Sequence, residues 1–309
     1  MAPTKIHFVG YHPTTSVQAR AVEVLRSGLE RELGDAVEFK FDPDIGELGH
    51  KAFEILDLVE AGDFDICYFY SSYLTERVPD LGLFELPFQI SGREAGYAML
   101  DGELGDELAD AIAAKTGYRL LAYWDNGIRH LSNGRHTIRT PADCSGLKLR
   151  TARNQIHQDA FRAIGFEPIF VDVKDLGDAA KTGRIDAQEN PLTNIVNYGL
   201  ERYHRHITLT GHLFGISAVL ANARAYESWP GSVHDALATA MTEATAAQRR
   251  FATEIDDECA QRLTAAGTEI TALSEAERAA FAKSVAPVVE TERARFDPSL
   301  LASFDAGRG

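Results

Sequence analysis

The sequence predicts an α/β protein in which parallel strands alternate with helices. Short apolar runs alternate with amphipathic segments through the first two thirds of the chain, a rhythm typical of parallel sheets covered by helices on both faces. The last third changes to long helical segments rich in alanine and glutamate. A length of 309 residues suggests about two domains or one large one. No repeat or flexible linker divides the chain, so we expect lobes joined by several chain crossings.

The first third contains three expected strands and two expected helices. Its first helix places Val17, Val24 and Leu25 at helical spacing, and Gly34 ends it. The strands are expected at residues 5–10, 37–41 and 65–70, and the helices at residues 16–33 and 53–59.

The same alternation continues through the middle of the chain. Ser274 and Glu277 then have the spacing of a capping box at the start of the last long helix. Strands are expected at residues 118–124, 147–151, 168–171 and 185–188, and helices at residues 156–164, 176–181, 232–263 and 274–296.

Composition excludes several classes of function. A formal net charge of -15 makes nucleic acid an unsuitable partner, because phosphate binding requires clustered lysine and arginine. The cysteines Cys67, Cys144 and Cys259 have no metal or redox spacing, and we expect no metal and no cofactor. No apolar run approaches the length of a membrane span. The first strand follows Met1 almost at once, which leaves no room for a cleavable leader.

The stretch IDAQENPLTNI leads from an expected strand into an expected helix. Asn190 is a good helix N-cap and Pro191 suits the first helical position, so local structure alone explains these residues. The carboxyl end of a strand is also where open α/β sheets bind ligands. Both interpretations stay open at this point.

The strand GLKLRT presents the same choice. Leu147 and Leu149 share one face, which leaves Lys148 and Arg150 on the other. Two cations on one strand face are either solvated or paired with an anion.

The weaker candidates lie at other strand ends, where a contact with a ligand and ordinary core packing are equally good explanations. Asp125 and His130 could form an acid/base pair in an enzyme, but Asp125 lies in an Asp-Asn-Gly run of residue types that favour turns. We therefore expect Asp125 at a turn or hinge. The candidates of this kind are Tyr11, His12, Tyr70, Ser71, Trp124, Asp125 and Phe214.

Several motifs together resemble the solute-binding proteins of tripartite ATP-independent periplasmic (TRAP) transporters, in particular the dicarboxylate-binding proteins. The motifs are DLGLFELPF, YWDNGIRHLSN, GLKLRT and DLGDAAKTGRIDAQENP, followed by HITLTGH, and they span nearly the whole chain. Asn190 follows Arg150 by 40 residues, as in the family pattern. The chain departs from that pattern at Ala187, where glycine is common, and at Gly177, where tyrosine is usual.

The resemblance implies a two-lobed periplasmic-binding-protein-like fold, with a long helix spanning both lobes and a ligand cleft between them. Lobe I would comprise residues 1–123 with about 214–250, and lobe II residues 124–213 with about 251–309. The resemblance implies that Arg150 binds a ligand carboxylate, that Arg129 supplies a second, more variable arginine, and that Asn190 contacts the ligand. We also considered a pairing of Asp125 with Arg129, which would leave one free cation.

The function implied by the resemblance is capture of a small organic acid anion for a TRAP-type membrane permease, without chemistry. The protein would be a periplasmic monomer that binds no nucleic acid and does not insert into the membrane. Because no leader precedes the first strand, a leader missing from this sequence and a cytoplasmic form are both consistent with it. The alternatives are a soluble sensor of an organic acid and an enzyme acting on a small carboxylic acid.

Overall fold

A computed structural model describes residues 2–308, and the chain divides into two compact units. Unit 1 comprises Met1–Ser71, Ala109–Asp125 and Ile216–Ile255, and unit 2 comprises Ser72–Leu108, Asn126–Gly215 and Asp256–Gly309. Residues 72–108, which the expected boundaries assign to the first lobe, belong to unit 2. Within that unit, Gly82 lies against Phe296 and Ile156. We describe each unit by itself.

Unit 1 contains a sheet in which β1 (Thr4–Val9) lies between two parallel neighbours. These neighbours are β2 (Val37–Asp42) and β3 (Ile66–Tyr70). On its other side, β3 pairs antiparallel with the last part of β8 (His206–Asn222). The β-α-β alternation expected from the first third of the sequence is confirmed, with helix α1 (Val17–Leu33) following β1.

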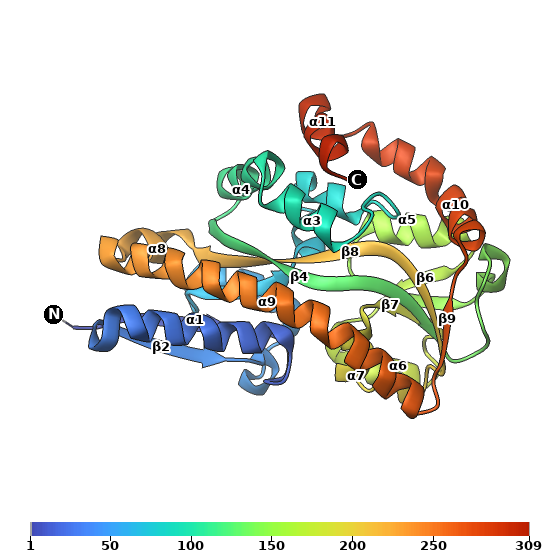
Figure 1. Cartoon of the computed structure of the whole chain (residues 1–309), viewed down its shortest axis with the longest axis horizontal. Coiled ribbons are helices and arrows are strands. Elements are labelled where there is room, and N and C mark those ends of the chain that lie inside the picture. Colours follow the sequence, from blue (N-terminus) through green and yellow to red (C-terminus); the bar gives the residue numbers. More distant parts are fainter. Residues whose placement is uncertain (1, 309) are drawn as a thin grey trace. The chain divides into compact units, whose positions relative to one another are not determined.

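Two helices cover this sheet side by side, α1 and the first part of α9 (Gly231–Ala265) (Figure 1). They approach closely because Gly28 of α1 has no side chain where a Cβ atom would lie 2.7 Å from the Cβ of Ala240. The core beneath them includes Phe8, Leu25 and Leu237. The shorter helices of unit 1 are α2 (Ile55–Ala61) and α8 (Ala223–Ser228).

Unit 2 contains the strands that position the candidate site. Strand β5 (Lys148–Thr151) lies between β6 (Glu167–Phe170) and β7 (Ala187–Asn190), both parallel to it. On its other side, β7 pairs antiparallel with the second half of β4 (Tyr118–Asn133). The short strand β9 (Glu269–Ala272) pairs parallel with the first part of β8.

The helices of unit 2 complete its core, in which Phe161, Leu149 and Leu131 pack against Phe281 and Val285. Ser274 and Glu277 form the expected capping box at the start of α10. The helices are α3 (Arg93–Leu100), α4 (Glu103–Lys115, shared with unit 1), α5 (Gln155–Ile164), α6 (Leu176–Lys181), α7 (Leu192–Asn197), α10 (Glu275–Arg293) and α11 (Pro298–Gly307).

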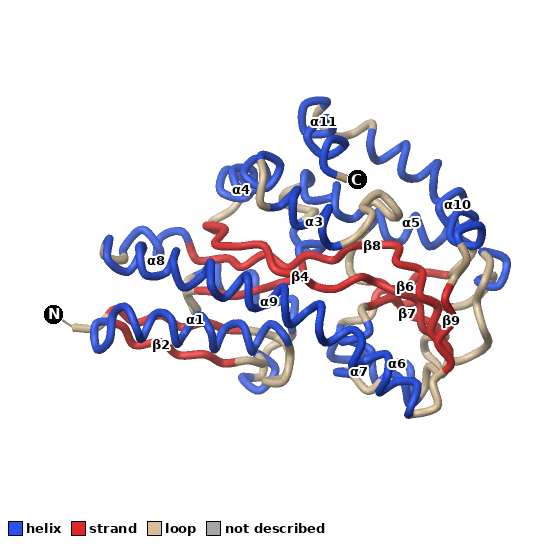
Figure 2. Tube along the Cα trace, viewed as in Figure 1, coloured by secondary structure: helices blue, strands red, loops and turns tan. Residues whose placement is uncertain are grey.

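Strand β4 is much longer than expected and strand β8 was not expected; the tube of Figure 2 shows both. The expected strand at residues 118–124 continues to Asn133, so the turn expected as one alternative at Asp125 is wrong. The other alternative, a hinge, stays a prediction; Asp125 is the last residue of its unit 1 segment. Gly127 resolves the conflict, because its φ of +88° is a left-handed conformation that glycine adopts without strain. A side chain at Gly127 would also overlap the ring of Pro191.

Candidate functional site

The structure divides the expected site residues between the two units. Within unit 2, Arg129 and Asn190 are in direct contact, and Tyr73 lies in the electrostatic field of both Arg129 and Arg150. The unit 2 candidates are Arg129, Arg150, Asn190 and Phe214, and the unit 1 candidates are Tyr11, His12, Tyr70, Ser71, Trp124 and Asp125.

Strand register places the two arginines on opposite faces of the unit 2 sheet. Arg150 on β5 is opposite Gln188 on β7, so these two side chains share a face. Leu131 on β4 is opposite Glu189 on β7, and Arg129 lies two residues before Leu131 on that same face. Each arginine therefore has different neighbours.

Arg129 forms a buried bidentate ion pair with Glu189. The Arg129 Nε and Nη2 atoms lie 2.5 and 2.8 Å from the two carboxylate oxygens. The two side chains are only 2% and 0% exposed. Burial raises the pKa of the Glu189 carboxyl, but the charge of Arg129 and hydrogen bonds from His212 and Arg129 lower it further, so the pKa lies well below its usual range. The charge of Arg129 is thus neutralised within the protein.

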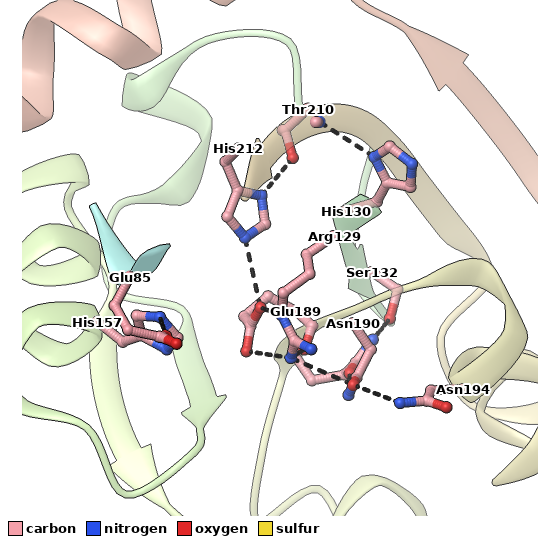
Figure 3. A network of polar contacts seen from close by, with 12 residues as sticks. Glu85, Arg129, His130, Ser132, His157, Glu189, Asn190, Asn194, Thr210 and His212 are labelled. Carbon is pink, nitrogen blue, oxygen red and sulfur yellow. Dashed lines mark hydrogen bonds and ion pairs between the residues drawn. The ribbon is translucent and has the colours of Figure 1, made fainter. Parts of the chain in front are cut away.

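His212 extends this pair, as Figure 3 shows. Burial holds the pKa of His212 below its ordinary value, so the ring is neutral. Its Nε2 lies 3.4 Å from the Glu189 carboxylate, which only accepts hydrogen bonds, so Nε2 carries the proton. Nδ1 is then an acceptor, and the Thr210 hydroxyl donates to it at 2.6 Å.

Asn190 ends β7 and does not cap the following helix, as local sequence suggested it could. The N-cap of α7 is Pro191, which has no side-chain hydrogen bond to the helix. The Asn190 Oδ1 atom accepts from Arg129 and from Asn194, each at 3.2 Å. Asn190 Nδ2 must therefore be the donor toward Gln188, at 2.5 Å.

The orientation of Asn190 continues through a chain of directed hydrogen bonds. Because Gln188 Oε1 accepts from Asn190, its Nε2 donates to the Ser132 hydroxyl, at 2.6 Å. The Ser132 hydroxyl lies 3.1 Å from His204 Nδ1, to which it can donate a hydrogen bond. Burial lowers the pKa of His204 to about 4, so this ring is neutral and accepts at Nδ1. A charged guanidinium therefore fixes the direction of every hydrogen bond in the chain.

Arg150 differs from Arg129 in having no acidic partner. Its side chain is buried, at 3% exposure, and its Nε donates to the carbonyl of Val171 at 2.8 Å. Among residues 2–308, no carboxylate lies within ion-pair distance of this guanidinium. Lys148, on the same strand face, is exposed, so the solvated-face interpretation holds for Lys148 and is wrong for Arg150.

Tyr73 lies beside Arg150, and the sequence did not mark it as a candidate. Burial raises the pKa of the Tyr73 phenol, the charge of Arg150 lowers it, and the charge of Asp172 raises it again; the net pKa is above its usual value. A hydrogen bond from Arg150 also acts on the phenol oxygen. Tyr73, Arg150 and Asp172 therefore form a polar cluster, which we call the Arg150 cluster.

The remaining candidates are mostly explained by packing. In unit 1, the indole of Trp124 is fully buried and donates to Thr245 at 3.0 Å. The backbone of Asp125 exchanges two hydrogen bonds with the Gln248 amide, at 2.9 and 2.7 Å. In unit 2, Phe214 packs against Gly96 and contacts Tyr97 edge to face.

Of the side chains after β1 and β3 in unit 1, Tyr11 is partly buried and His12, Tyr70 and Ser71 are buried. The rings of Tyr11 and His12 lie 4.0 Å apart, and burial lowers the pKa of His12 to about 3. Tyr70 is 5% exposed, and the Ser71 hydroxyl is buried without a hydrogen-bond partner. A buried hydroxyl of this kind is suited to a polar ligand.

Comparison with known proteins identifies the family to which this chain belongs. A family model described as "Bacterial extracellular solute-binding protein, family 7" matches residues 8–295. The chain belongs to this family. It is 30% identical over 230 residues to the C4-dicarboxylate-binding periplasmic protein DctP of Rhodobacter capsulatus, a match that covers 74% of this chain and 68% of that protein.

Solved structures of two binding proteins share the fold. A TRAP periplasmic solute-binding protein from Bordetella bronchispeptica has a TM-score of 0.92 at 27% identity, covering 99% of this chain and 100% of the other. The sugar acid binding protein DctPAm from Advenella mimigardefordensis, in complex with galactonate, has a TM-score of 0.94 at 25% identity, covering 99% and 98%.

Membership establishes the general role and fold of the chain. It is a TRAP-type solute-binding protein with the two-lobed fold of that family, and family members are periplasmic proteins that bind carboxylates for transport. In residues 2–308, no helix combines the length and the hydropathy of a membrane span.

Proposed function

We propose that this protein binds a small organic carboxylate through Arg150 and delivers it to a TRAP permease without chemical change. The observation that supports this most strongly is the buried guanidinium of Arg150, which has no carboxylate partner among residues 2–308. A buried cation is stable only when an anion or hydrogen bonds compensate it. A planar guanidinium offers a carboxylate two parallel hydrogen bonds, so a ligand acid is the natural counter-ion.

In this proposal, Arg129 and Asn190 have roles that differ from those of Arg150. Glu189 already neutralises Arg129, so Arg129 positions Asn190 through the 3.2 Å hydrogen bond between them. Asn190 Oδ1 is shared by two donors, and one proton of Nδ2 is directed at Gln188. The remaining Nδ2 proton can donate to a ligand oxygen. One free cation and one amide donor suit a single carboxylate.

The geometry supports binding in preference to catalysis. His130 was the candidate base, but burial and, to a smaller extent, the charges of Arg93 and Arg129 lower its pKa to about 3. A base with so low a pKa removes protons poorly near neutral pH. Its Nδ1 already accepts the backbone N–H of Gly211 at 3.1 Å. We also propose a monomer in the periplasm, following the family.

A thermal-shift screen tests the proposed function. The protein is unfolded and refolded to remove carried-over ligand, and its Tm is measured with organic acids and with the matching uncharged amides. A ligand at a hundred times its Kd stabilises a protein by about 2.7 kcal/mol, a readily measured shift. We expect a shift with an acid and none with its amide. Equal shifts from acid and amide, or none from any acid, would refute carboxylate capture.

A further inference from the structure

Asp172 of the Arg150 cluster is a buried carboxylate with only one of its two oxygens satisfied. The residue is 6% exposed and lies at the N-cap of a 3-10 turn, Val173–Asp175. Its Oδ1 accepts the backbone N–H of Lys174 at 3.0 Å. Its Oδ2 is buried and has no hydrogen-bond partner. Helix capping therefore explains one oxygen and leaves the other without a role.

The unsatisfied oxygen belongs to the same region as Arg150. Arg150 donates to the carbonyl of Val171, the residue immediately before Asp172, at 2.8 Å. Arg150 and Asp172 act on the pKa of the Tyr73 phenol with opposite signs, so both charges lie near that phenol. Yet no ion pair joins Asp172 to Arg150 in residues 2–308. The cation and the anion are neighbours that do not neutralise each other.

We propose that Asp172 Oδ2 accepts a hydrogen bond from a hydroxyl group of the bound acid, which makes the ligand a hydroxylated monocarboxylate. This inference rests on the proposed function, because it takes Arg150 as the residue that binds the ligand carboxylate. The inference specifies a second group of the ligand, a hydroxyl, in addition to the carboxylate that Arg150 would bind.

The chemistry of Asp172 selects among the acids that Arg150 would accept. A carboxylate accepts hydrogen bonds and cannot donate them, so its partner must be a donor. A ligand hydroxyl is a neutral donor, and its hydrogen bond to a charged acceptor is among the stronger kinds. A plain aliphatic acid would leave Oδ2 buried and unsatisfied, which is costly. A second ligand carboxylate would place two negative charges side by side.

Tyr73 gives the same region a second polar group. Its raised pKa keeps the phenol protonated near neutral pH. A phenol can donate and accept, so it can contact either the carboxylate or a hydroxyl of the ligand. Asp172 is the group that discriminates, because it tolerates a donor and repels an anion.

Isothermal titration with three acids of equal chain length tests the inference. D-erythronate has hydroxyl groups and one carboxylate, butyrate has one carboxylate alone, and succinate has a second carboxylate. We expect the wild-type protein to bind D-erythronate at least about tenfold more tightly than butyrate and succinate, which is the effect of one hydrogen bond to a charged group. Butyrate or succinate binding as tightly as D-erythronate would overturn the inference.

The variant Asp172→Asn separates the role of Oδ2 from that of the cap. Asparagine is as good an N-cap as aspartate, so its Oδ1 can keep the bond to Lys174, while an amide donor replaces Oδ2. We expect D-erythronate affinity to fall at least about tenfold and succinate affinity to stay or rise. Asp175→Asn is the matched control, since Asp175 lies in the same turn and is exposed. A loss of D-erythronate affinity as small in Asp172→Asn as in Asp175→Asn would overturn the inference.

These outcomes are distinct from failure of the proposed function. If no acid binds the wild-type protein, carboxylate capture itself is wrong. If acids bind and Arg150→Lys abolishes binding, but hydroxyl groups and Asp172 make no difference, the capture proposal stands and the assignment of Asp172 falls. The comparison of the three acids needs only wild-type protein, so it decides the inference even if Asp172→Asn does not fold.

Discussion

The buried pair of Arg129 and Glu189 provides a sharp prediction about stability. Glu189→Gln keeps the shape of the side chain but removes the carboxylate charge that pairs with the buried Arg129 guanidinium. Removing one partner of a buried ion pair costs about 3–5 kcal/mol. In a unit of this size, each kcal/mol lowers Tm by about 2–4 °C, so we expect Tm to fall by about 6–20 °C.

Glu76→Gln is the matched control for this substitution. Glu76 pairs with Arg153 in the same unit, but the side chains are 68% and 67% exposed. An exposed pair contributes at most about 1 kcal/mol. Differential scanning calorimetry and urea unfolding measure both variants. If Glu189→Gln lowers the free energy of unfolding no more than Glu76→Gln does, the charge of Arg129 is not neutralised by Glu189 in the way described.

The double variant Arg129→Met with Glu189→Leu completes the test. Replacing both partners with apolar residues removes the uncompensated charge as well as the pair, so it is expected to be less destabilising than Glu189→Gln alone. A double variant as unstable as the sum of the two single variants would show that each residue acts through other contacts.

Three further predictions concern pH, backbone and hydrogen bonding. Burial lowers the pKa values of His204 and His12 to about 4 and about 3, so below pH 6.5 these residues bind protons in the unfolded chain but not in the native protein. The free energy of unfolding should therefore fall as the pH is lowered from 6.5 toward 4. His204→Asn should reduce the slope of unfolding free energy against pH, measured by urea unfolding, by the equivalent of about one proton. Gly127→Ala is expected to cost about 1–3 kcal/mol of stability, because φ is +88° and the Cβ atom would meet Pro191. Gly177→Ala, in helix α6, is expected to cost none, because its Cβ would make only an ordinary contact at 3.7 Å with the carbonyl oxygen of Tyr198. Equal effects of the two variants in chemical unfolding would contradict this account. Gln188→Leu leaves the Asn190 Nδ2 donor and the Ser132 hydroxyl acceptor without their Gln188 partners. We expect acid affinity in titration calorimetry and stability each to fall by about 1–3 kcal/mol, and unchanged affinity would remove Gln188 from the positioning of Asn190.

Local patterns predicted most of the elements, but the expected strand at residues 118–124 was too short and strand β8 was missed. The β-α-β alternation and the capping box at Ser274 depend on neighbours in sequence, and both are confirmed. Strand β8 was not expected, because most of its residues are buried on both faces and show no alternation of apolar and polar residues. The Asp-Asn-Gly run indicated a turn, but packing of Gly127 on Pro191 keeps the run within β4. Tertiary contacts decided both cases.

The residues of the candidate site were also only partly predictable from the sequence. Arg150, Arg129 and Asn190 were available from the resemblance, because their motifs are readable along the chain. Glu189 lies beside Asn190 in the quoted stretch, yet its role depends on the pairing of β4 with β7 across 60 residues of sequence. No local pattern distinguishes Asp172 from an ordinary N-cap, since its unsatisfied oxygen is visible only in the packed structure.

The affinity of Arg150→Lys for an organic acid tests the central claim most directly. Arg153→Lys is the control, because Arg153 is 67% exposed and lies three residues further along the same segment. Titration calorimetry with the best acid from the thermal-shift screen, alongside the Tm without ligand, separates binding from folding. We predict that Arg150→Lys lowers affinity at least about tenfold with a Tm close to that of wild type, while Arg153→Lys binds normally. Equal affinities of the two variants would contradict the claim that Arg150 holds the ligand carboxylate.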